Sequence, residues 1–305
     1  MCFVYYYLVL GEVMECNLCP RMCGADRREG KGFCGTGEIV YIARAAAHYG
    51  EEPCICGKKG SGAVFFSGCS LKCVFCQNEE ISRTEKGRGF TVDELSALFL
   101  SLQSLGVHNI NLVTPTHYAV QIASALKRSS LKIPVIYNTS GYESEKSLDY
   151  VNESVDVYLP DFKYFYRSSA EKFSNAPDYP EVAKNALRIM FKQVGIPVFE
   201  GGMMKKGVLV RHLVLPGHTL ESKRIIEWLY ENFGNDIYIS IMCQYTPMRA
   251  FVNFPELNRK VSSMEYREVV RFAERLGVVN AFVQGEESVG KNFIPDFSGK
   301  YFSVL

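Results

Sequence analysis

The stretch that decides the fold is Ala63-Val64-Phe65-Phe66-Ser67-Gly68-Cys69-Ser70-Leu71-Lys72-Cys73-Val74-Phe75-Cys76. Its first four residues are apolar, which predicts a short buried strand. Three cysteines follow at Cys69, Cys73 and Cys76, so one short loop supplies three thiolates. An iron–sulfur cube normally takes four thiolates. The loop therefore predicts a cluster with one iron left free to bind something that is not protein.

A structural zinc ion is the alternative metal for this loop. A structural zinc site needs four side-chain ligands, which are usually close together in the sequence. No cysteine or histidine follows Cys76 within a dozen residues. The spacing therefore favours a cluster over zinc.

The loop Cys69-x-x-x-Cys73-x-x-Cys76, with Phe75 before the last cysteine, resembles the signature loop of the radical S-adenosylmethionine (SAM) enzymes. The resemblance implies that the free iron of a 4Fe-4S cluster is chelated by the amino and carboxylate groups of SAM. It also implies that an electron from the cluster cleaves the sulfonium and produces a 5'-deoxyadenosyl radical. The cysteines are then both metal ligands and part of the catalytic centre.

Composition limits the class of protein. The chain has 305 residues, 47% of them hydrophobic and 22% charged, which is enough for one large domain with appendages. The formal net charge is +1 and the basic residues are dispersed, so neither nucleic acid nor a membrane is expected as a partner. The 11 cysteines are bunched in loops at ligand-like spacings, which predicts metal binding in a reducing cytoplasm.

The sequence divides into four predicted parts: an uncertain tail (1–13), a cysteine-rich N-terminal segment (14–60), a β/α barrel (61–285) and a C-terminal extension (286–305). The apolar run at residues 3–10 has no basic residues before it and no small-residue cleavage site after it, so it is not a signal peptide. It is also shorter than the roughly 20 residues of a membrane span.

Short apolar runs alternate with amphipathic stretches throughout the third part, which predicts a parallel sheet wrapped by helices. The predicted strands are 63–66, 109–113, 134–137, 155–159, 208–213, 237–242 and 281–283. The predicted helices are 91–105, 119–127, 143–151, 179–194, 220–233 and 263–276. The expected fold class is α/β, a partial parallel (β/α)6-type barrel with a small cysteine-rich N-terminal segment.

In such barrels the chemistry lies at the C-terminal ends of the strands. The polar residues expected there, and expected to bind the cofactor, are Thr114, Thr116, His117, Asn138, Ser140, Asp161, Lys163 and Arg211. Lys163 or Arg211 can bind the SAM carboxylate through a charge-assisted hydrogen bond. Oxygens near Thr114 and Thr116 can accept from the ammonium group. Asn138 and Ser140 suit the ribose hydroxyls.

Three strand-end motifs extend the resemblance to one group within the radical SAM enzymes. Asn138-Thr139-Ser140-Gly141, Leu159-Pro160-Asp161-Phe162-Lys163 and Val210-Arg211-His212-Leu213-Val214-Leu215-Pro216-Gly217 resemble those of the pyruvate formate-lyase activating enzymes. The similarity extends to an uncharacterised activase-related branch with an N-terminal cysteine segment. It implies that Lys163 and Arg211 approach SAM, that flavodoxin or ferredoxin is the reductant, and that hydrogen is abstracted from a glycine of a partner protein. A small molecule or peptide remains an alternative substrate.

A second group of cysteines, Cys16, Cys19, Cys23 and Cys34, lies near the N-terminus with glycines between its members. Four thiolates within about twenty residues can saturate a metal. The spacing predicts a second metal site, and it does not choose between zinc and a second iron–sulfur cluster. Unligated thiols packed as small hydrophobic residues are the alternative.

The two cysteine groups together leave a different class of function open. A non-catalytic electron-transfer or sensing protein could use both groups as iron–sulfur or zinc sites. Such a protein would have a complete thiolate set on each cluster and no affinity for SAM. The strand-end Asp161, Lys163 and Arg211 argue against it, because an electron carrier has no need of a carboxylate-binding site.

Overall fold

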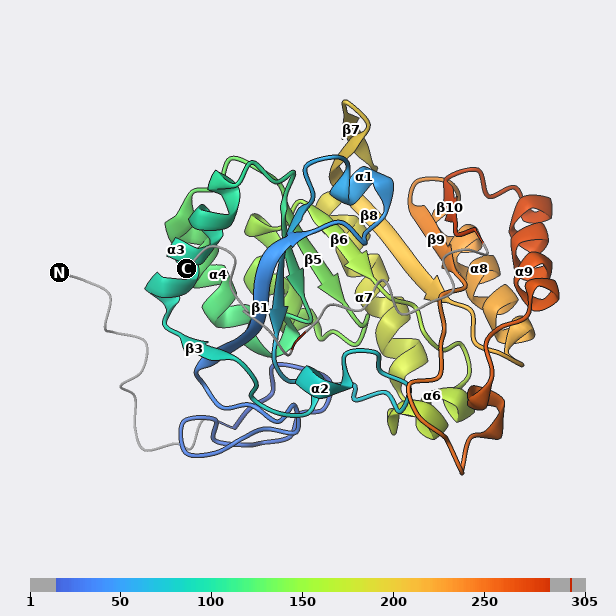
Figure 1. Cartoon of the computed structure of the whole chain (residues 1–305), viewed down its shortest axis with the longest axis horizontal. Helices are drawn as coiled ribbons and strands as arrows, with labels where there is room; N and C mark the ends of the chain where they lie inside the picture. Colours follow the sequence, from blue (N-terminus) through green and yellow to red (C-terminus); the bar gives the residue numbers. More distant parts are fainter. Residues whose placement is uncertain (1–14, 286–296, 298–305) are drawn as a thin grey trace.

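The computed structural model describes residues 15–285 and Phe297. In this part of the chain a curved sheet of ten strands has the order β10-β9-β8-β6-β5-β4-β2-β1-β3, with β7 paired to β8 (Figure 1). The parallel strands are β2 (Ser61–Phe66), β4 (Ile110–Val113), β5 (Val135–Thr139), β6 (Val157–Pro160), β8 (Met203–Leu213), β9 (Tyr238–Met242) and β10 (Ala281–Val283). These strands confirm every predicted one.

Three antiparallel strands were not predicted. They are β1 (Val40–His48), which pairs with β2 and with β3 (Arg88–Phe90), and β7 (Val198–Glu200), which pairs with β8. The sequence of β1 is rich in alanine, which has a low strand propensity, and β3 and β7 have only three residues each. Pairing to a neighbour, rather than local sequence, makes these segments strands.

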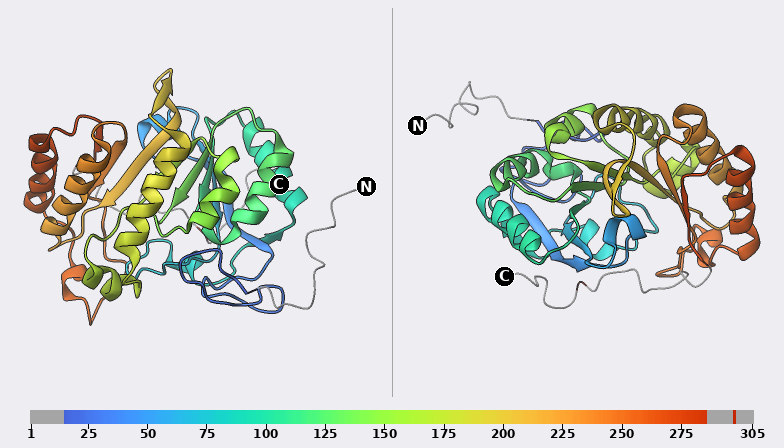
Figure 2. Two further views of the ribbon diagram at one scale, coloured as in Figure 1. Left: turned by 180° about the vertical axis from the view of Figure 1, so that it is seen from behind. Right: turned by 90° about the horizontal axis from the view of Figure 1, so that it is seen from above.

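The six predicted helices are confirmed with small shifts at their ends. They are α3 (Val92–Ser104), α4 (Ala119–Ser129), α5 (Glu145–Val151), α7 (Tyr179–Val194), α8 (Thr219–Phe233) and α9 (Ser263–Leu276). The helix α3 begins with a capping box between Thr91 and Glu94, as its sequence predicts. Figure 2 shows these helices along the outer face of the curved sheet.

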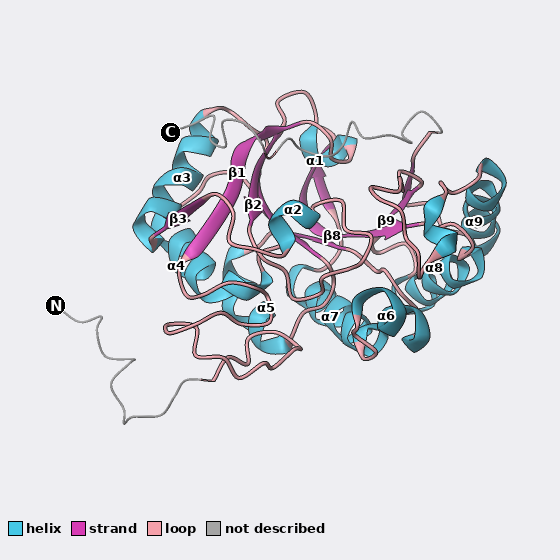
Figure 3. Ribbon diagram, turned by 60° about the horizontal axis from the view of Figure 1, so that its bottom comes forward, coloured by secondary structure: helices cyan, strands magenta, loops and turns pink. Residues whose placement is uncertain are grey.

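Shorter helices complete the described structure. They are α1 (Pro53–Cys56), α2 (Glu79–Ser82), α6 (Arg167–Ser174) and the 3-10 turns η1 (Thr116–Tyr118), η2 (Asn152–Ser154) and η3 (Pro255–Asn258). Figure 3 shows α2 inside the arc that the outer helices form. The helix α1 packs against β8. Short elements therefore lie along the inner side of the curve.

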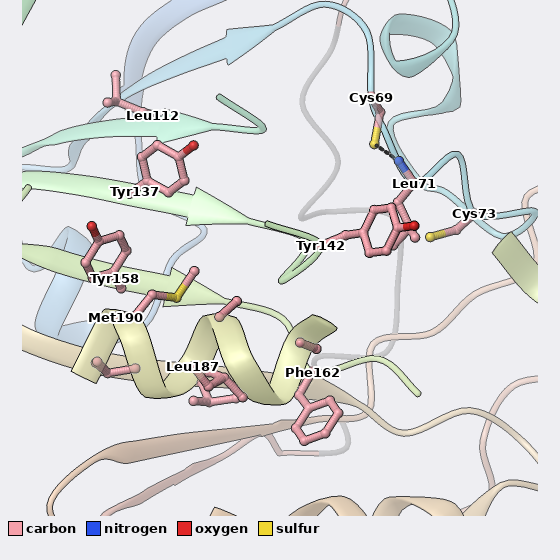
Figure 4. Packing of buried hydrophobic residues seen from close by; sticks show 14 of the residues in the cluster. Cys69, Leu71, Cys73, Leu112, Tyr137, Tyr142, Tyr158, Phe162, Leu187 and Met190 are labelled. Carbon is pink, nitrogen blue, oxygen red and sulfur yellow. Dashed lines mark hydrogen bonds between the residues drawn. The ribbon is translucent and has the colours of Figure 1, made fainter. Parts of the chain in front are cut away.

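Three central parallel strands are buried on both faces. Every residue of β2, β4 and β6 is buried, which explains why these strands appear in the sequence as continuous apolar runs. Behind the sheet, Tyr137 and Tyr158 pack edge to face with ring centroids 5.9 Å apart, beside Leu187 and Met190 of α7 (Figure 4). This core gives the strand ends a rigid support.

The α/β fold with a mostly parallel, open sheet agrees with the expected partial barrel. The predicted domain boundaries remain a prediction, and β1 of the cysteine-rich segment belongs to the same sheet as the barrel. The predicted tail at 1–13 lies outside the described residues, as does the 286–305 extension except for Phe297, which packs against Phe65 with ring centroids 5.6 Å apart. Within the described ranges, no helix has the length and apolar character needed to span a bilayer.

Candidate active site

A cavity of about 440 Å³ opens at the C-terminal ends of the parallel strands. Its volume falls in the range of small-molecule sites, which is roughly 300–1,000 Å³. Most of the predicted site residues line it together: Cys69, Cys73, Cys76, Thr114, Asn138, Ser140, Asp161, Lys163 and Arg211. They follow five different strands, so the fold brings them to one cavity, and their binding of a cofactor stays a prediction.

The three cysteines lie in the loop after β2. Cys69 and Cys73 are buried and Cys76 is partly buried. The amide of Leu71 is 3.4 Å from the Cys69 sulfur, and Figure 4 shows Cys73 on the other side of Leu71. Burial raises the pKa of the Cys76 thiol to about 12, and it raises that of Cys69 as well. The thiols of Cys69 and Cys76 are therefore protonated until a metal displaces their protons.

The donor set of this loop fits a 4Fe-4S cluster with one free iron. All three sulfur-bearing side chains belong to the wall of one cavity, and among the residues that the structure describes that wall contains no fourth cysteine. Cys69, Cys73 and Cys76 interact electrostatically with one another and with the ammonium of Lys163. Among the described residues, no three His, Cys, Asp or Glu side chains are arranged to hold a single metal ion.

Thr114 follows β4 and has a positive φ of 61°, which is unusual for a β-branched residue. Its amide donates a 2.8 Å hydrogen bond to the carbonyl of Asn138 at the end of β5. Strained backbone of this kind persists where the surrounding structure enforces it, and it is concentrated at functional sites. The two neighbouring strand ends are therefore held in a fixed relation at the cavity wall.

Lys163 and Asp161 form an ion pair on the same wall. Burial opposes the charge of the ammonium group, but Asp161 and the Cys73 thiol outweigh burial, so the pKa of Lys163 lies above its usual value. The backbone amide of Lys163 donates a 2.9 Å hydrogen bond to the hydroxyl oxygen of Tyr179. The site therefore keeps a positive charge close to the three cysteines.

Arg211 is paired with two glutamates that the sequence analysis did not single out. Its Nε atom lies 2.9 Å from Glu52, and its Nη2 atom bonds to both Glu51 and Glu52. Burial opposes the charged guanidinium, but the two carboxylates outweigh it and raise the pKa of Arg211. Both predicted carboxylate-binding cations thus already have acidic partners, and their contact with SAM remains a prediction.

Thr116 and His117 lie outside the cavity wall, in contrast to the other predicted residues. They form the turn η1, which carries both side chains into the protein interior. Thr116 bonds to the buried Glu143, and Nε2 of His117 lies 2.7 Å from the carbonyl oxygen of Ser67. Burial lowers the pKa of His117 to about 3, so the ring is neutral and supports the cluster loop from behind.

The sequence analysis did not assign several other wall residues to the site, namely His48, Glu51, Glu52, Ser240, Gln244 and Gln284. Gln284 follows β10 and donates to Gln244 after β9 at 2.9 Å. The strand-end position of Gln244 and Gln284 was a usable signal. Glu51 and Glu52 had none, because they follow an antiparallel strand that the sequence did not reveal.

Comparison with known proteins places the chain in a family. Residues 63–229, more than half of the chain, match the model of the radical SAM superfamily, and the chain belongs to that superfamily. Membership indicates an enzyme that binds SAM and cleaves it with an iron–sulfur cluster. This finding confirms the resemblance to the radical SAM enzymes. Membership in the activating-enzyme branch remains a prediction.

The chain is 28% identical to an uncharacterized protein of Methanocaldococcus jannaschii over 272 residues, which cover 86% of this chain and 75% of that protein. Among solved structures it is similar to a radical SAM methyltransferase from Sphaerobacter thermophilus, with a TM-score of 0.50 and 14% identity over 73% of this chain and 65% of that one. This likeness shows the fold alone.

A structure of Streptococcus suis SuiB bound to precursor peptide SuiA is also similar, with a TM-score of 0.49 and 15% identity. The alignment covers 71% of this chain and 46% of that one. The chain thus spans less than two thirds of the length of both solved proteins.

Proposed function

We propose that this protein reductively cleaves SAM at a 4Fe-4S cluster held by Cys69, Cys73 and Cys76, and that it thereby abstracts hydrogen from a glycine of a partner protein. When bound, the cluster supplies the electron for cleavage. The observation that carries the proposal is the shared wall of one cavity, on which three thiols meet the charged and polar strand ends.

The residues of the chain provide binding and orientation. The ammonium of Lys163, beside the cysteines, is the proposed partner of the SAM carboxylate. The strand ends at Thr114, Asn138 and Ser140 provide oxygens and an amide for the amino group and ribose. Phe75 lines the cavity and packs edge-on against Tyr164 with ring centroids 6.3 Å apart, so an apolar ring lies beside the cysteines.

The strand-end motifs around Asn138, Asp161 and Arg211 support the activating-enzyme type, because they resemble those of the pyruvate formate-lyase activating enzymes. On that basis the proposed reductant is a flavodoxin or ferredoxin, and the proposed compartment is the cytoplasm. A non-catalytic electron carrier is the second candidate. It would not need the charged wall at Lys163 and Arg211, and it would leave SAM intact.

The test is anaerobic reconstitution with iron and sulfide, reduction, and assay for 5'-deoxyadenosine. We expect SAM cleavage by the wild type and by Cys54→Ala, which removes a buried thiol outside the cavity wall. We expect no cleavage by Cys73→Ala. A loaded wild type that leaves SAM intact, or equal activity in Cys73→Ala, would contradict the proposal. Adding candidate partner proteins and recording a glycyl radical signal by electron paramagnetic resonance (EPR) then tests the substrate.

A further inference from the structure

Four N-terminal cysteines outside the cavity are linked pair by pair, although no three of them, among the described residues, are arranged to hold a single metal ion. The sulfurs of Cys23 and Cys34 each lie 3.4 Å from the position that a Cβ atom on Gly32 would take. Cys16 hydrogen-bonds to Cys23, and Cys19 interacts electrostatically with both Cys16 and Cys34. We call Cys16, Cys19, Cys23 and Cys34 the N-terminal thiol group. Figure 1 shows its segment as the dark blue loops below β1.

Tight turns position these thiols and direct amides at their sulfurs. The amide of Met22 bonds to the carbonyl of Cys19 at 3.0 Å, and the amide of Gly24 bonds to the carbonyl of Cys16 at 3.1 Å. The amide of Arg21 reaches the Cys19 sulfur, and the amides of Ala25, Phe33 and Cys23 itself reach that of Cys23. Amide hydrogen bonds to sulfur stabilise metal-bound thiolates and tune cluster potentials.

The N-terminal thiol group is attached directly to the loop that carries the first cluster. The amide of Cys69 donates a 3.1 Å hydrogen bond to the carbonyl of Cys34. Gly68 permits this approach, because a Cβ atom there would lie 2.9 Å from the Cys34 carbonyl and 2.5 Å from a methyl group of Thr36. Arg21 adds a 2.9 Å bond to the carbonyl of Ser70.

The group also reaches the protein surface. Cys34, on the side of the cluster loop, is buried, whereas Cys23 is exposed. A redox centre that carries electrons inward needs one edge open to an external donor and another edge against the centre that it reduces. A structural zinc site needs neither. This placement favours an iron–sulfur cluster among the metals that four thiolates can hold.

We propose that Cys16, Cys19, Cys23 and Cys34 bind a second iron–sulfur cluster that relays electrons to the first. Loading displaces the thiol protons to solvent. In each relay step one electron passes from a low-potential flavoprotein or ferredoxin to the second cluster, and then to the first; no bond is made or broken. The relay role rests on the proposed function, whereas the presence of the second cluster does not.

The experiment compares metal contents after anaerobic reconstitution of the full chain with iron and sulfide. We expect about eight irons per chain in the wild type and about four in the triple variant Cys69→Ala/Cys73→Ala/Cys76→Ala, which keeps an EPR signal after reduction. Cys54→Ala, a matched buried cysteine, should match the wild type. A triple variant that folds by circular dichroism but holds no iron and sulfide would overturn the proposal, as would zinc in the N-terminal thiol group after anaerobic purification.

A single substitution covers the case in which the triple variant does not fold. Cys23→Ser changes an exposed side chain, so we expect the fold to persist and the EPR spectrum of the second cluster to change or disappear. An unchanged two-cluster spectrum in Cys23→Ser would contradict the assignment. These readouts do not depend on SAM cleavage, so the proposed function can fail while the second cluster stands.

Discussion

The Nε atom of Arg211 lies 2.9 Å from Oε1 of Glu52, although the two residues are 159 positions apart in the sequence. The pair joins the end of β8 to the segment before α1, across the inner side of the curved sheet. Both side chains are largely buried, with 13% and 7% of their surfaces exposed. A buried cation with two acidic partners fixes this side of the cavity.

The substitution Glu52→Gln should lower the free energy of unfolding by about 3 kcal/mol, because removing one partner of a buried pair leaves the other charge poorly compensated. Urea unfolding of the anaerobic, metal-free protein measures this change in the free energy of unfolding. As a control, Glu80→Gln breaks the more exposed pair with Lys86 and should cost less than about 1 kcal/mol. Equal effects of the two substitutions would contradict the prediction.

The pH dependence of the same pair has a definite sign. Burial tends to raise the pKa of Glu52, but the charge of Arg211 outweighs burial and holds it below the ordinary value of 4.5. Because the folded pKa is the lower one, the stabilisation is complete above pH 4.5 and is lost as the pH falls through the folded pKa. Acid titration of unfolding should therefore show a shallower loss of stability in Glu52→Gln than in the wild type.

Gly141 should not tolerate a side chain. Its φ is +77°, and a Cβ atom would lie 2.2 Å from the carbonyl oxygen of Asp161. Gly106 has the same φ with nothing within 4 Å, so Gly106→Ala measures the backbone cost alone, about 1 kcal/mol. We expect Gly141→Ala to cost about 2 kcal/mol more than this control and to weaken SAM binding, since the strand end at Asp161 must move. Identical unfolding midpoints for the two variants would show that the clash is relieved.

The buried Glu143 should make the free energy of unfolding depend on pH with the opposite sign. Burial, partly offset by hydrogen bonds from Thr116 and Thr139, raises the pKa of its carboxyl group from 4.5 to about 7. The unfolded chain then ionises first, so the free energy of unfolding falls as pH rises from 4.5 to about 7, by up to about 3 kcal/mol. Glu143→Gln removes this dependence. Denaturation of both proteins at about pH 5 and about pH 8 measures the difference, and parallel pH profiles would refute the prediction.

Lys163 should contribute to SAM affinity through its charge. Lys163→Met keeps most of the side-chain volume and removes the ammonium, so we expect the Kd for SAM to rise about 10- to 100-fold, the range of a charge-assisted hydrogen bond. Equilibrium dialysis on anaerobically loaded protein gives the Kd. Lys172→Met, which removes a lysine paired with Glu256 away from the cavity wall, should leave it unchanged. An unaltered Kd in Lys163→Met would exclude the residue from the SAM site.

Much of the fold could be predicted because the parallel strands and outer helices carry strong local patterns. The strand at Ser61–Phe66 is uniformly apolar, and the helices Tyr179–Val194 and Ser263–Leu276 end where the sequence predicts. The strand Val40–His48 could not be predicted in the same way. Its alanines have little strand propensity, and only pairing to β2 and β3 makes it extended.

The candidate site was predicted in part for a similar reason. Residues at the C-terminal ends of parallel strands converge wherever the sheet forms, so Asp161, Lys163 and Asn138 could be placed from strand order alone. His117 belongs to the same kind of strand end, but a single 3-10 turn carries it inward. Side-chain direction after a strand depends on backbone dihedral angles that the residue types do not specify.

The sequence by itself determined that three thiols share one loop behind a buried strand, and that polar groups follow each parallel strand, because both are consequences of spacing along the chain. Only the tertiary structure decided that Arg211 pairs with Glu51 and Glu52, and that Cys34 lies against Cys69. Those contacts join segments distant in sequence. They depend on the curvature of the sheet and on the glycines that let two backbone segments approach each other closely. The packing of distant segments against one another determines both features.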